Sequence, residues 1–311
     1  MWSVIITRKL GKGQPESEKM NAFKKKAAPY FYLSPTIILM IVLMLIPIVM
    51  VISYSVMNNV IMNKNPIYIG LGNYKTILTD EVFHTTIYNT LFFTIGSVVM
   101  HMVIGLLFAM LLNSRLFSTA TKSFFRVIYI LPWVFTAAII AILWRLLLNP
   151  NGIINYFLTQ AGIIHTKVEW LGSRDTALYA LTFINIWSGY PFYMISLLAG
   201  LQGISQDLYE AAEVDGANAY HQFISITIPQ LKPIILSMAM LDCIWTMQQF
   251  PLVWMTTGGG PIHATEMLST YTYKLAFSKY EFSLASASAV IILIFSMVLA
   301  SVYVRRQKAS V

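Results

Sequence analysis

Charged side chains are scarce in this sequence. Asp, Glu, Lys and Arg make up only 11% of its 311 residues, whereas hydrophobic residues make up 57%. A soluble domain carries about 25% charged residues. With so few charges a water-soluble fold would be coated in apolar surface, and lipid is the solvent that tolerates such a surface. The composition therefore predicts a membrane protein.

Residues that build several common kinds of site are also few or scattered. The single cysteine, Cys243, lies in an apolar run, which excludes a disulfide framework and a cysteine-based metal site. The five histidines do not gather into a metal-ligand set, and we interpret His101, within an apolar window, as a packing or hydrogen-bonding residue. The net charge of +8 forms no basic stripe with interleaved aromatics, so nucleic acid binding is not expected.

Long apolar windows are the main feature of the sequence. A spanning helix needs about 20 mostly apolar residues, and six windows meet this requirement: 30–56, 90–112, 124–148, 177–200, 233–255 and 284–304. Backbone in lipid must satisfy its hydrogen bonds within the segment, as a helix does. The predicted fold class is therefore all-α, a polytopic transmembrane helical bundle with six spans. The first window is too long for a signal peptide and is expected to be retained.

The positions of the cations predict how the spans are oriented. With the N-terminus in the cytoplasm, fourteen of the 21 Lys and Arg residues fall in cytoplasmic segments and seven fall outside. Both termini are then cytoplasmic. This predicts a cytoplasmic N-terminal segment over 1–29, a transmembrane domain over 30–304 and a cytoplasmic tail over 305–311, in a multi-pass protein of the bacterial plasma membrane.

One predicted cytoplasmic loop, 201–231, departs from the basic pattern, because it has four acidic residues and no Lys or Arg. Its sequence predicts a helix, a glycine turn and a second helix. Ser205 is a good N-cap, Gly216 can take φ > 0 and end the first helix, and Asn218 can cap the second. Pro229 is expected to end this second helix before the fifth span. The loop could lie in a groove of a partner protein or simply cover the end of the bundle.

The same loop carries a specific motif. Glu210-Ala-Ala-x-x-Asp-Gly-Ala217, followed by Ile226-Thr-Ile-Pro229, resembles the EAA loop of ABC importer permeases. Ile228 stands where that family usually has leucine, and Ser205 stands where proline is common.

A second block supports a subgroup of that family. Thr257-Gly-Gly-Gly-Pro261 and Ala285-Ser-Ala287 resemble the outer loop and last helix of maltose-type sugar permeases, which usually have glycine where Ser283 stands. The glycine triplet is no phosphate-binding loop, because no Gly-x-x-x-x-Gly-Lys-Ser/Thr pattern accompanies it. The resemblance covers all six predicted spans.

This resemblance implies a type I ABC importer permease fold and a transport subunit that is not itself an enzyme. The loop would be the coupling helix that docks on an ATP-hydrolysing subunit, a role carried over to Glu210, Ala211, Ala212, Asp215, Gly216 and Ala217. The implied partners are a second homologous permease in a heterodimer, two ATP-binding subunits that hold ATP and Mg, an extracytoplasmic solute-binding protein and the lipid bilayer. No cofactor and no metal is expected in this chain.

Polar residues in the fifth window are candidates for solute binding. Asp242, Trp245 and Gln249 recur at i, i+3 and i+7, so they share one helical face. Intramembrane polar groups usually face the bundle interior or a wet cavity. An aromatic ring beside amides suits a sugar, because the ring stacks on C–H groups while amides bond to hydroxyls. By resemblance Thr246 and Gln248 join this set, although glutamines can equally serve as interhelical hydrogen-bonding groups.

The fourth window adds candidates around Pro191. Gly189, Tyr190 and Phe192 are similar to a Gly-aromatic-Pro-aromatic break that lines the solute site in the family. Glycine removes bulk there and the aromatic rings can stack. The aromatic residues could equally belong to the belt at the membrane interface.

The predicted function is ATP-driven import of a mono- or oligosaccharide by alternating access. A polyol or glycerophosphate-type solute is the alternative, disfavoured because no cation sits in mid-span to meet a phosphate. An ion-coupled secondary transporter would show internal repeats and a coupling carboxylate, yet Asp242 is the only acid deep in a span and no repeat pairs with it. A membrane-embedded enzyme would need an acid–base pair or a metal set within the spans, and the sequence shows neither.

Overall fold

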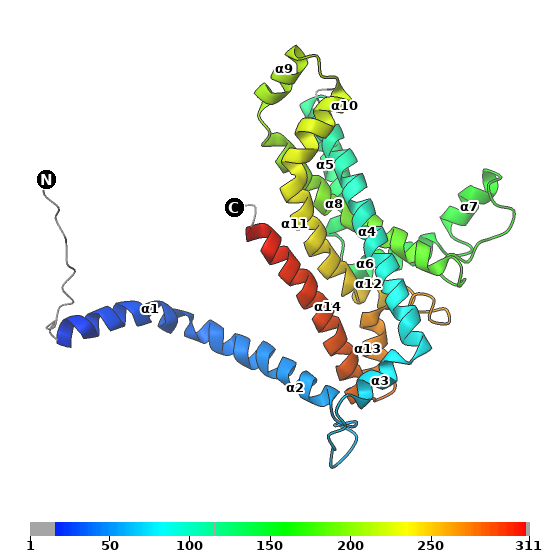
Figure 1. Cartoon of the computed structure of the whole chain (residues 1–311). Coiled ribbons are helices and arrows are strands. Elements are labelled where there is room, and N and C mark those ends of the chain that lie inside the picture. Colours follow the sequence, from blue (N-terminus) through cyan, green and yellow to red (C-terminus); the bar gives the residue numbers. More distant parts are fainter. Residues whose placement is uncertain (1–15, 115, 309–311) are drawn as a thin grey trace, which may run out of the picture. The chain divides into compact units, whose positions relative to one another are not determined.

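The computed structural model describes residues 16–114 and 116–308, with side chains described for 28–114 and 116–305. Within these residues the regular structure is helical and no β-strand occurs, apart from an isolated bridge between Met57 and Tyr68. The predicted all-α class is thus confirmed for the described residues. The chain forms two compact units, Met1–Ser53 and Tyr54–Val311 (Figure 1).

From residue 16 onward the first unit is one long helical segment, which ends just inside the second unit. α1 (Glu16–Met40), a π-helical segment η1 (Ile41–Leu45) and α2 (Ile46–Ser55) follow one another without a break. Residues Ala28–Ser55 include a window with a mean hydropathy of 3.0, which is enough to cross a membrane. The π-helical turn ends two residues before Pro47. Because proline lacks the N–H of a regular helical bond, a wider turn before it accommodates the missing donor.

Two long helices form the centre of the second unit. α4 (Glu81–Asn113) and α8 (Ala177–Gln202) pack along each other. Gly105 on α4 permits this close approach, because a Cβ there would collide with Tyr193 of α8. Small residues at such contacts let helix backbones approach within a membrane protein.

Two further helices complete this centre, as Figure 1 shows. α5 (Thr119–Val134) packs against α8, and α11 (Ile228–Met247) packs against both α4 and α8. Buried apolar side chains of α4, α8 and α11 form one cluster: Ala109, Leu112, Tyr193, Met194, Leu197, Leu198, Leu201, Leu231 and Met238. This cluster anchors the end of the bundle beside the loop 201–231.

Four described helices are long and apolar enough to cross a membrane, and one bent pair could supply a fifth span. The four are Ala28–Ser55, Glu81–Asn113, Ala219–Met247 and Phe282–Arg305. α8 is not among them, although it has 26 residues, because polar residues, glycine and proline lower the hydropathy of its middle. The described helices support a multi-pass membrane protein, and the number of six spans stays a prediction.

The third apolar window, 124–148, is not one straight span. α5 ends at Val134, α6 (Ala137–Leu147) follows, and the two are bent by 99°. Pro132 lies in the last turn of α5, and Thr136 caps α6 by accepting a hydrogen bond from the N–H of Ile139 at 3.5 Å. A proline that removes a donor and an N-cap that starts a new helix explain the break.

The fifth window, 233–255, is also interrupted. α11 ends at Met247, and a separate short helix, α12 (Pro251–Thr256), follows. The C-cap of α11, Gln248, has non-helical dihedral angles, with φ of −96° and ψ of 9°, and Pro251 starts α12. Gln249 therefore lies beyond the helix on which its i+7 spacing was based.

The expectation that Pro229 ends the second helix of the loop 201–231 is wrong. α10 (Ala219–Gln222), a π-helical segment η2 (Phe223–Thr227) and α11 form one continuous helix. As before Pro47, the π-helical turn ends two residues before the proline. The wider turn takes up the missing donor, so the helix continues from the loop into the bundle.

α13 (Leu268–Phe277) and α14 (Phe282–Lys308) pack against each other, and α14 also packs against α3 (Gly72–Leu78). Their shared core consists of Ile77, Phe83, Leu268, Tyr271, Leu275, Ala285 and Ala287. The hydroxyl of Tyr271 donates a hydrogen bond to Asp80 Oδ2 at 2.7 Å, which links α13 to the N-cap of α4.

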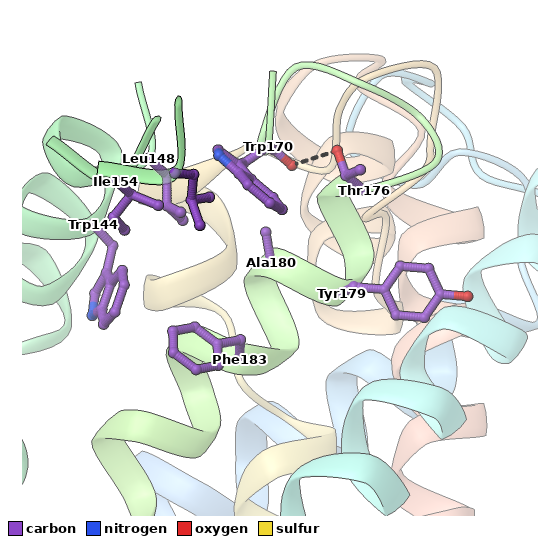
Figure 2. Close-up of a pocket in the computed structure, with 9 residues that line it drawn as sticks. Trp144, Leu148, Ile154, Trp170, Thr176, Tyr179, Ala180 and Phe183 are labelled. Atoms are coloured by element: carbon purple, nitrogen blue, oxygen red, sulfur yellow. Dashed lines mark hydrogen bonds between the residues drawn. The ribbon is translucent and has the colours of Figure 1, made fainter. Parts of the chain in front are cut away.

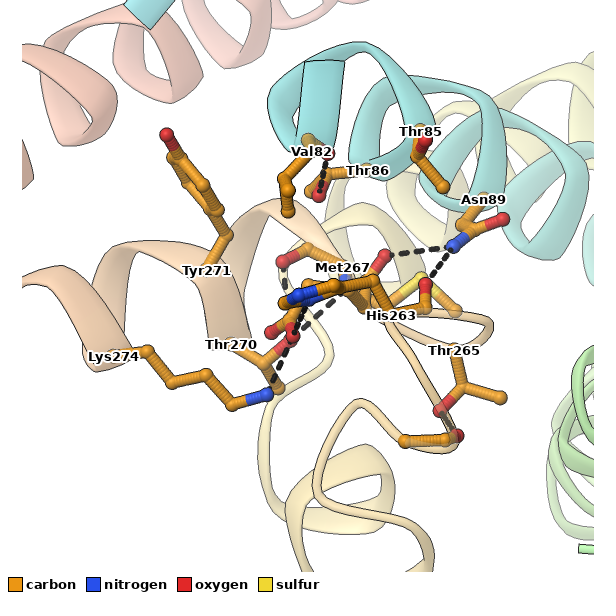
Figure 3. A network of polar contacts seen from close by, with 12 residues as sticks. Val82, Thr85, Thr86, Asn89, His263, Thr265, Met267, Thr270, Tyr271 and Lys274 are labelled. Carbon is orange, nitrogen blue, oxygen red and sulfur yellow. Dashed lines mark hydrogen bonds and ion pairs between the residues drawn. The ribbon is translucent and has the colours of Figure 1, made fainter. Parts of the chain in front are cut away.

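A buried carboxylate organises the loop between α12 and α13 (Figure 3). Glu266 is fully buried, and its Oε2 lies 2.5 Å from Lys274 Nζ and 3.1 Å from His263 Nδ1. Asn89 of α4 donates from Nδ2 to the main-chain carbonyls of His263 and Glu266 at 3.0 and 3.1 Å. Gly259, with φ of +87°, leaves room for the carboxylate that a Cβ would overlap. The glycine triplet is thus part of a turn built around an ion pair.

The segment between α6 and α8 is held by one amide. Asn155, on α7 (Ile153–Gln160), is 1% exposed. Its Nδ2 donates to the carbonyl of Val168 at 2.8 Å, and its Oδ1 accepts from Trp170 Nε1 at 3.1 Å. These bonds fix the end of the segment against α7.

Candidate functional site

A cavity of about 240 Å³ lies in the second unit where α4, α5, α6, α8 and α11 meet. Its described lining residues include no Lys or Arg: they are His101, Pro132, Trp133, Phe135, Ala137, Ile140, Asn185, Ser188, Gly189, Phe192, Asp242, Trp245, Thr246, Gln249 and Leu252. Phe192 forms an aromatic wall with Trp245 and Trp133, at centroid distances of 5.8 and 6.2 Å. The cavity therefore combines aromatic faces with amide and hydroxyl groups.

The break between α5 and α6 contributes one side of this cavity. Pro132 and Trp133 reach it from α5, Phe135 from the linker and Ala137 from the first turn of α6. Trp133 was not among the solute candidates predicted from the sequence. The bend places it in the lining.

A buried histidine and a buried acid meet in the cavity. His101 Nδ1 lies 2.8 Å from Asp242 Oδ2, and the side chains of these residues are 3% and 11% exposed. The other imidazole nitrogen, Nε2, lies 2.9 Å from the main-chain carbonyl of Asn185. Thr246 Oγ1 donates to the second carboxylate oxygen of Asp242 at 2.9 Å. One polar cluster thus joins α4, α8 and α11.

Gly189 is required by this cluster. A Cβ at position 189 would overlap the imidazole of His101. One turn earlier on α8, the carbonyl of Asn185 also accepts a hydrogen bond from Ser188 Oγ at 3.0 Å. The amide nitrogen of Asn185 is buried without a hydrogen-bond partner and belongs to the cavity lining.

The structure brings six of the eight candidate solute residues together in this lining, namely Asp242, Trp245, Thr246, Gln249, Gly189 and Phe192. Tyr190 and Gln248 lie outside it. The buried Tyr190 ring packs edge-on against Phe108 at 5.3 Å. Gln248 is exposed and donates from Nε2 to Ser296 Oγ at 3.0 Å. Because α11 ends at Met247, the neighbouring Gln248 and Gln249 diverge.

The hydrogen bonds of His101 confirm its interpretation as a hydrogen-bonding residue, but its place in the cavity was not predicted. One signal could have indicated it. Thr90, Thr94, Ser97 and His101 are spaced by four, three and four residues, and all four are buried on α4. Polar residues that recur at helical spacing within an apolar window mark a face turned toward other helices.

The loop 201–231 has the local structure that its sequence predicts. Ser205 caps α9 (Gln206–Val214) by accepting from the N–H of Asp207, and Asn218 caps α10 by accepting from the N–H of His221. Gly216 has φ of +82°. The N–H groups of Ala217 and Gly216 donate to the carbonyls of Ala212 and Glu213 at 2.8 and 3.0 Å, which is the Schellman ending of a helix.

The acidic side chains of the loop are exposed, and a hydrogen bond anchors α9 to the helix that follows it. Glu210, Ala211, Asp215 and Gly216 are exposed, and Ala212 and Ala217 are half-buried. Among the ion pairs of the described side chains, none involves the acids of this loop. Two hollows flank α9, one of about 880 Å³ beside Glu210 and one of about 380 Å³ beside Asp215. The Tyr209 hydroxyl lies 2.9 Å from Thr227 Oγ1 and ties α9 to η2.

Residues 101–309, more than half of the chain, match the family described as the inner membrane component of binding-protein-dependent transport systems. The chain belongs to this family. The matched residues include both the loop 201–231 and the described lining of the polar cavity. The resemblance to ABC importer permeases is thereby confirmed.

Some relatives of this permease have names that refer to a sugar. A trehalose/maltose transport system permease protein of Thermococcus litoralis is 33% identical over 279 residues, which cover 89% of this chain and 92% of that protein. A diacetylchitobiose uptake system permease protein of Streptomyces coelicolor is 30% identical over 76% of this chain and 72% of that protein. The chain is therefore an ABC importer permease subunit with sugar permeases among its homologues.

Solved structures show the same fold. A bacterial alginate ABC transporter in complex with an alginate pentasaccharide-bound periplasmic protein has a TM-score of 0.79 and 24% identity, with 91% of this chain and 94% of that chain covered. A second structure, of a bacterial ABC transporter involved in the import of alginate, has a TM-score of 0.75 and 22% identity, covering 94% and 99% of the two chains. The permease thus has the fold of ABC importer permeases.

The permease also has an apolar cavity of about 410 Å³ (Figure 2). Its lining consists of Trp144, Leu148, Ile154, Leu158, Trp170, Thr176, Tyr179, Ala180 and Phe183. The Thr176 hydroxyl is engaged, because it donates to the carbonyl of Trp170 at 2.9 Å. Aromatic walls without amide groups cannot satisfy the hydroxyls of a sugar. The polar cavity at His101 is the better candidate for the solute site.

Proposed function

We propose that this permease is one of two homologous permease subunits of an importer that carries a mono- or oligosaccharide across the plasma membrane, driven by ATP hydrolysis in separate subunits. The observation that carries the proposal is the polar cavity between the helices, in which an aromatic wall faces amide groups. Saccharides present C–H faces that stack on aromatic rings and hydroxyls that bond to amides. Sugar permeases among the relatives support this solute class.

The solute would meet the aromatic wall and the free polar groups. Phe192 and Trp245 supply ring faces, and Gln249 and the unpartnered amide of Asn185 supply hydrogen bonds. Among the described lining residues no cation is available for a phosphate. This composition favours a saccharide over a glycerophosphate-type solute.

Coupling to ATP hydrolysis would pass through a single helix. The exposed motif of α9 docks on an ATP-binding subunit, which binds ATP and Mg. From the loop, the continuous helix Ala219–Met247 runs to the cavity and carries Asp242, Trp245 and Thr246. At a rise of about 1.5 Å per residue, such a helix transmits a displacement over roughly 40 Å. Closure of the ATP-binding pair would in this way switch the cavity between outward and inward access.

The complete importer would contain this permease, a second homologous permease, two ATP-binding subunits and an extracytoplasmic solute-binding protein. The loop 201–231 then lies on the cytoplasmic side, together with both chain termini. The structure of a bacterial alginate ABC transporter in complex with an oligosaccharide-bound periplasmic protein, whose matched chain has the same fold, supports the proposal of a solute-binding partner.

The test is the ATPase activity of the complete reconstituted complex, with binding protein and a panel of saccharides, polyols and glycerophosphates. We expect a saccharide-loaded binding protein to stimulate hydrolysis, and Glu210→Ala to abolish the stimulation while the permease still inserts. Glu213→Ala is the matched control, because Glu213 is exposed on the same helix but stands at a variable position of the motif. Stimulation by a polyol or glycerophosphate alone would reassign the solute, and uptake by the chain alone under an ion gradient would overturn the proposal.

A further inference from the structure

The protons of the His101–Asp242 pair can be counted from its contacts. A carbonyl oxygen only accepts hydrogen bonds, so Nε2 of His101, 2.9 Å from the carbonyl of Asn185, carries a proton. One further proton must lie between Nδ1 and Asp242 Oδ2, which are 2.8 Å apart. The pair is either an imidazolium with a carboxylate or a neutral imidazole with a carboxylic acid. In both forms it has no net charge.

Both oxygens of Asp242 are thereby occupied. Oδ2 is held by His101, and Oδ1 accepts from Thr246 Oγ1 at 2.9 Å. Asp242 is the only acid among the described residues that line the cavity. Each of the two oxygens therefore already takes part in a hydrogen bond within the protein, so a solute hydroxyl would have to share an oxygen that is in use.

We propose that His101 is a positioning residue of the solute cavity. It neutralises Asp242, holds it away from the solute and ties α4, α8 and α11 together beside Gly189. The inference rests on the proposed transport function and changes the role of Asp242 from a solute ligand to a structural anchor. A buried carboxylate without a partner is strongly unfavourable, so the cavity keeps its uncharged state only while His101 is present.

The contacts around the pair support this role. The imidazole lies against Gly189, where a side chain would overlap it, and its ring centroid lies 6.0 Å from that of Tyr193. The histidine is 2% exposed. A group so enclosed, with both nitrogens engaged, has no free edge for a solute. Its effect on transport must therefore act through Asp242 and the three helices.

Replacing Asp242 by the uncharged asparagine distinguishes an anchoring role of Asp242 from direct binding of the solute. In Asp242→Asn, the amide can donate to Nδ1 of a neutral His101, and its oxygen can still accept from Thr246. We expect this variant to transport within about twofold of wild type, because the hydrogen bonds persist. In His101→Ala the carboxylate loses its partner, and we expect transport to fall by at least about tenfold.

The decisive variant is the double replacement His101→Ala with Asp242→Asn, made in the complete complex with its binding protein. We expect it to recover most of the solute-stimulated ATPase activity and uptake that His101→Ala loses, since no buried charge remains. His263→Ala is the matched control: His263 also contacts a carboxylate, but Glu266 keeps Lys274 as a partner. That variant should behave as wild type.

Two outcomes would overturn the inference. If Asp242→Asn is as impaired as His101→Ala, Asp242 acts on the solute directly. If the double variant is no better than His101→Ala, the ring serves only for packing. A wild-type complex that no saccharide stimulates would instead contradict the proposed function. The pair would then be tested by the apparent melting temperature of the same variants, with the same recovery expected in the double replacement.

Discussion

Gly189 of α8 faces His101 of α4 so closely that a side chain of even one carbon at position 189 would overlap the imidazole. We predict that Gly189→Ala displaces the ring from Asp242 and destabilises the protein by about 1–3 kcal/mol, as overpacking commonly does. The measurement is the apparent melting temperature of the complex together with solute-stimulated ATPase activity.

The control for this variant is another helical glycine. At Gly96 of α4 a Cβ would lie 3.5 Å from Thr182 Cγ2, which is an ordinary contact. Gly96→Ala should leave stability unchanged or raised, because alanine favours helix by up to about 1 kcal/mol. Equal behaviour of the two variants would show that the close contact of Gly189 with His101 does not affect stability.

The hydroxyl of Tyr209 bonds the helix α9 to η2, which is part of the continuous helix that reaches the cavity. We predict that Tyr209→Phe, which removes the bond to Thr227 at 2.9 Å, weakens this link by about 1 kcal/mol. The expected result is reduced stimulation of ATP hydrolysis with an unchanged basal rate. Tyr220→Phe, at an exposed position of the same loop, should have no effect. Full stimulation in Tyr209→Phe would mean that motion passes to the cavity by another route.

The buried Glu266 makes the loop between α12 and α13 depend on Lys274. Breaking a buried ion pair from one side costs about 3–5 kcal/mol, because the remaining charge is left uncompensated. Lys274→Met should therefore lower the apparent melting temperature and make this loop sensitive to added protease. Adding Glu266→Gln to Lys274→Met should restore part of the loss, and additive destabilisation by the two replacements would contradict the assigned pairing.

Asn155 should be the most sensitive polar residue of the segment between α6 and α8. In Asn155→Ala the half-buried N–H of Trp170 and the carbonyl of Val168 lose their partner, at up to about 1–3 kcal/mol for each group left unsatisfied. We expect faster proteolysis within this segment, measured by mass spectrometry of the fragments. Gln160→Ala, at the exposed end of α7 in the same segment, is the control, and equal proteolysis of the two variants would refute the anchoring role.

Sequence reasoning succeeded where the determinants are local. The caps at Ser205 and Asn218 and the positive φ of Gly216 follow from side chains within three residues of the helix ends they serve, so the fold of the loop could be predicted. Composition alone was enough for the helical membrane class. The motif at Glu210 led to the family because its residues are contiguous in the chain.

Sequence reasoning failed where a helix bends, ends or widens without a matching change in hydropathy, and where segments distant in the chain meet. Hydropathy does not distinguish a straight span from α5 and α6, nor a helix end from the π-helical turn before Pro229. The i, i+3, i+7 pattern assumed that α11 continues past Met247. His101 and Asp242 are 141 residues apart in the chain, and no periodicity in a single sequence joins them.

The 99° bend between α5 and α6 interrupts main-chain hydrogen bonding beside the polar cavity. The first N–H groups of α6 have no partner within their own helix, and the Thr136 side chain takes up one of them. Side-chain replacement leaves these donors in place. A scan of alanine variants would therefore leave these main-chain donors untested, whereas exchanging single amides for esters by semisynthesis would test them.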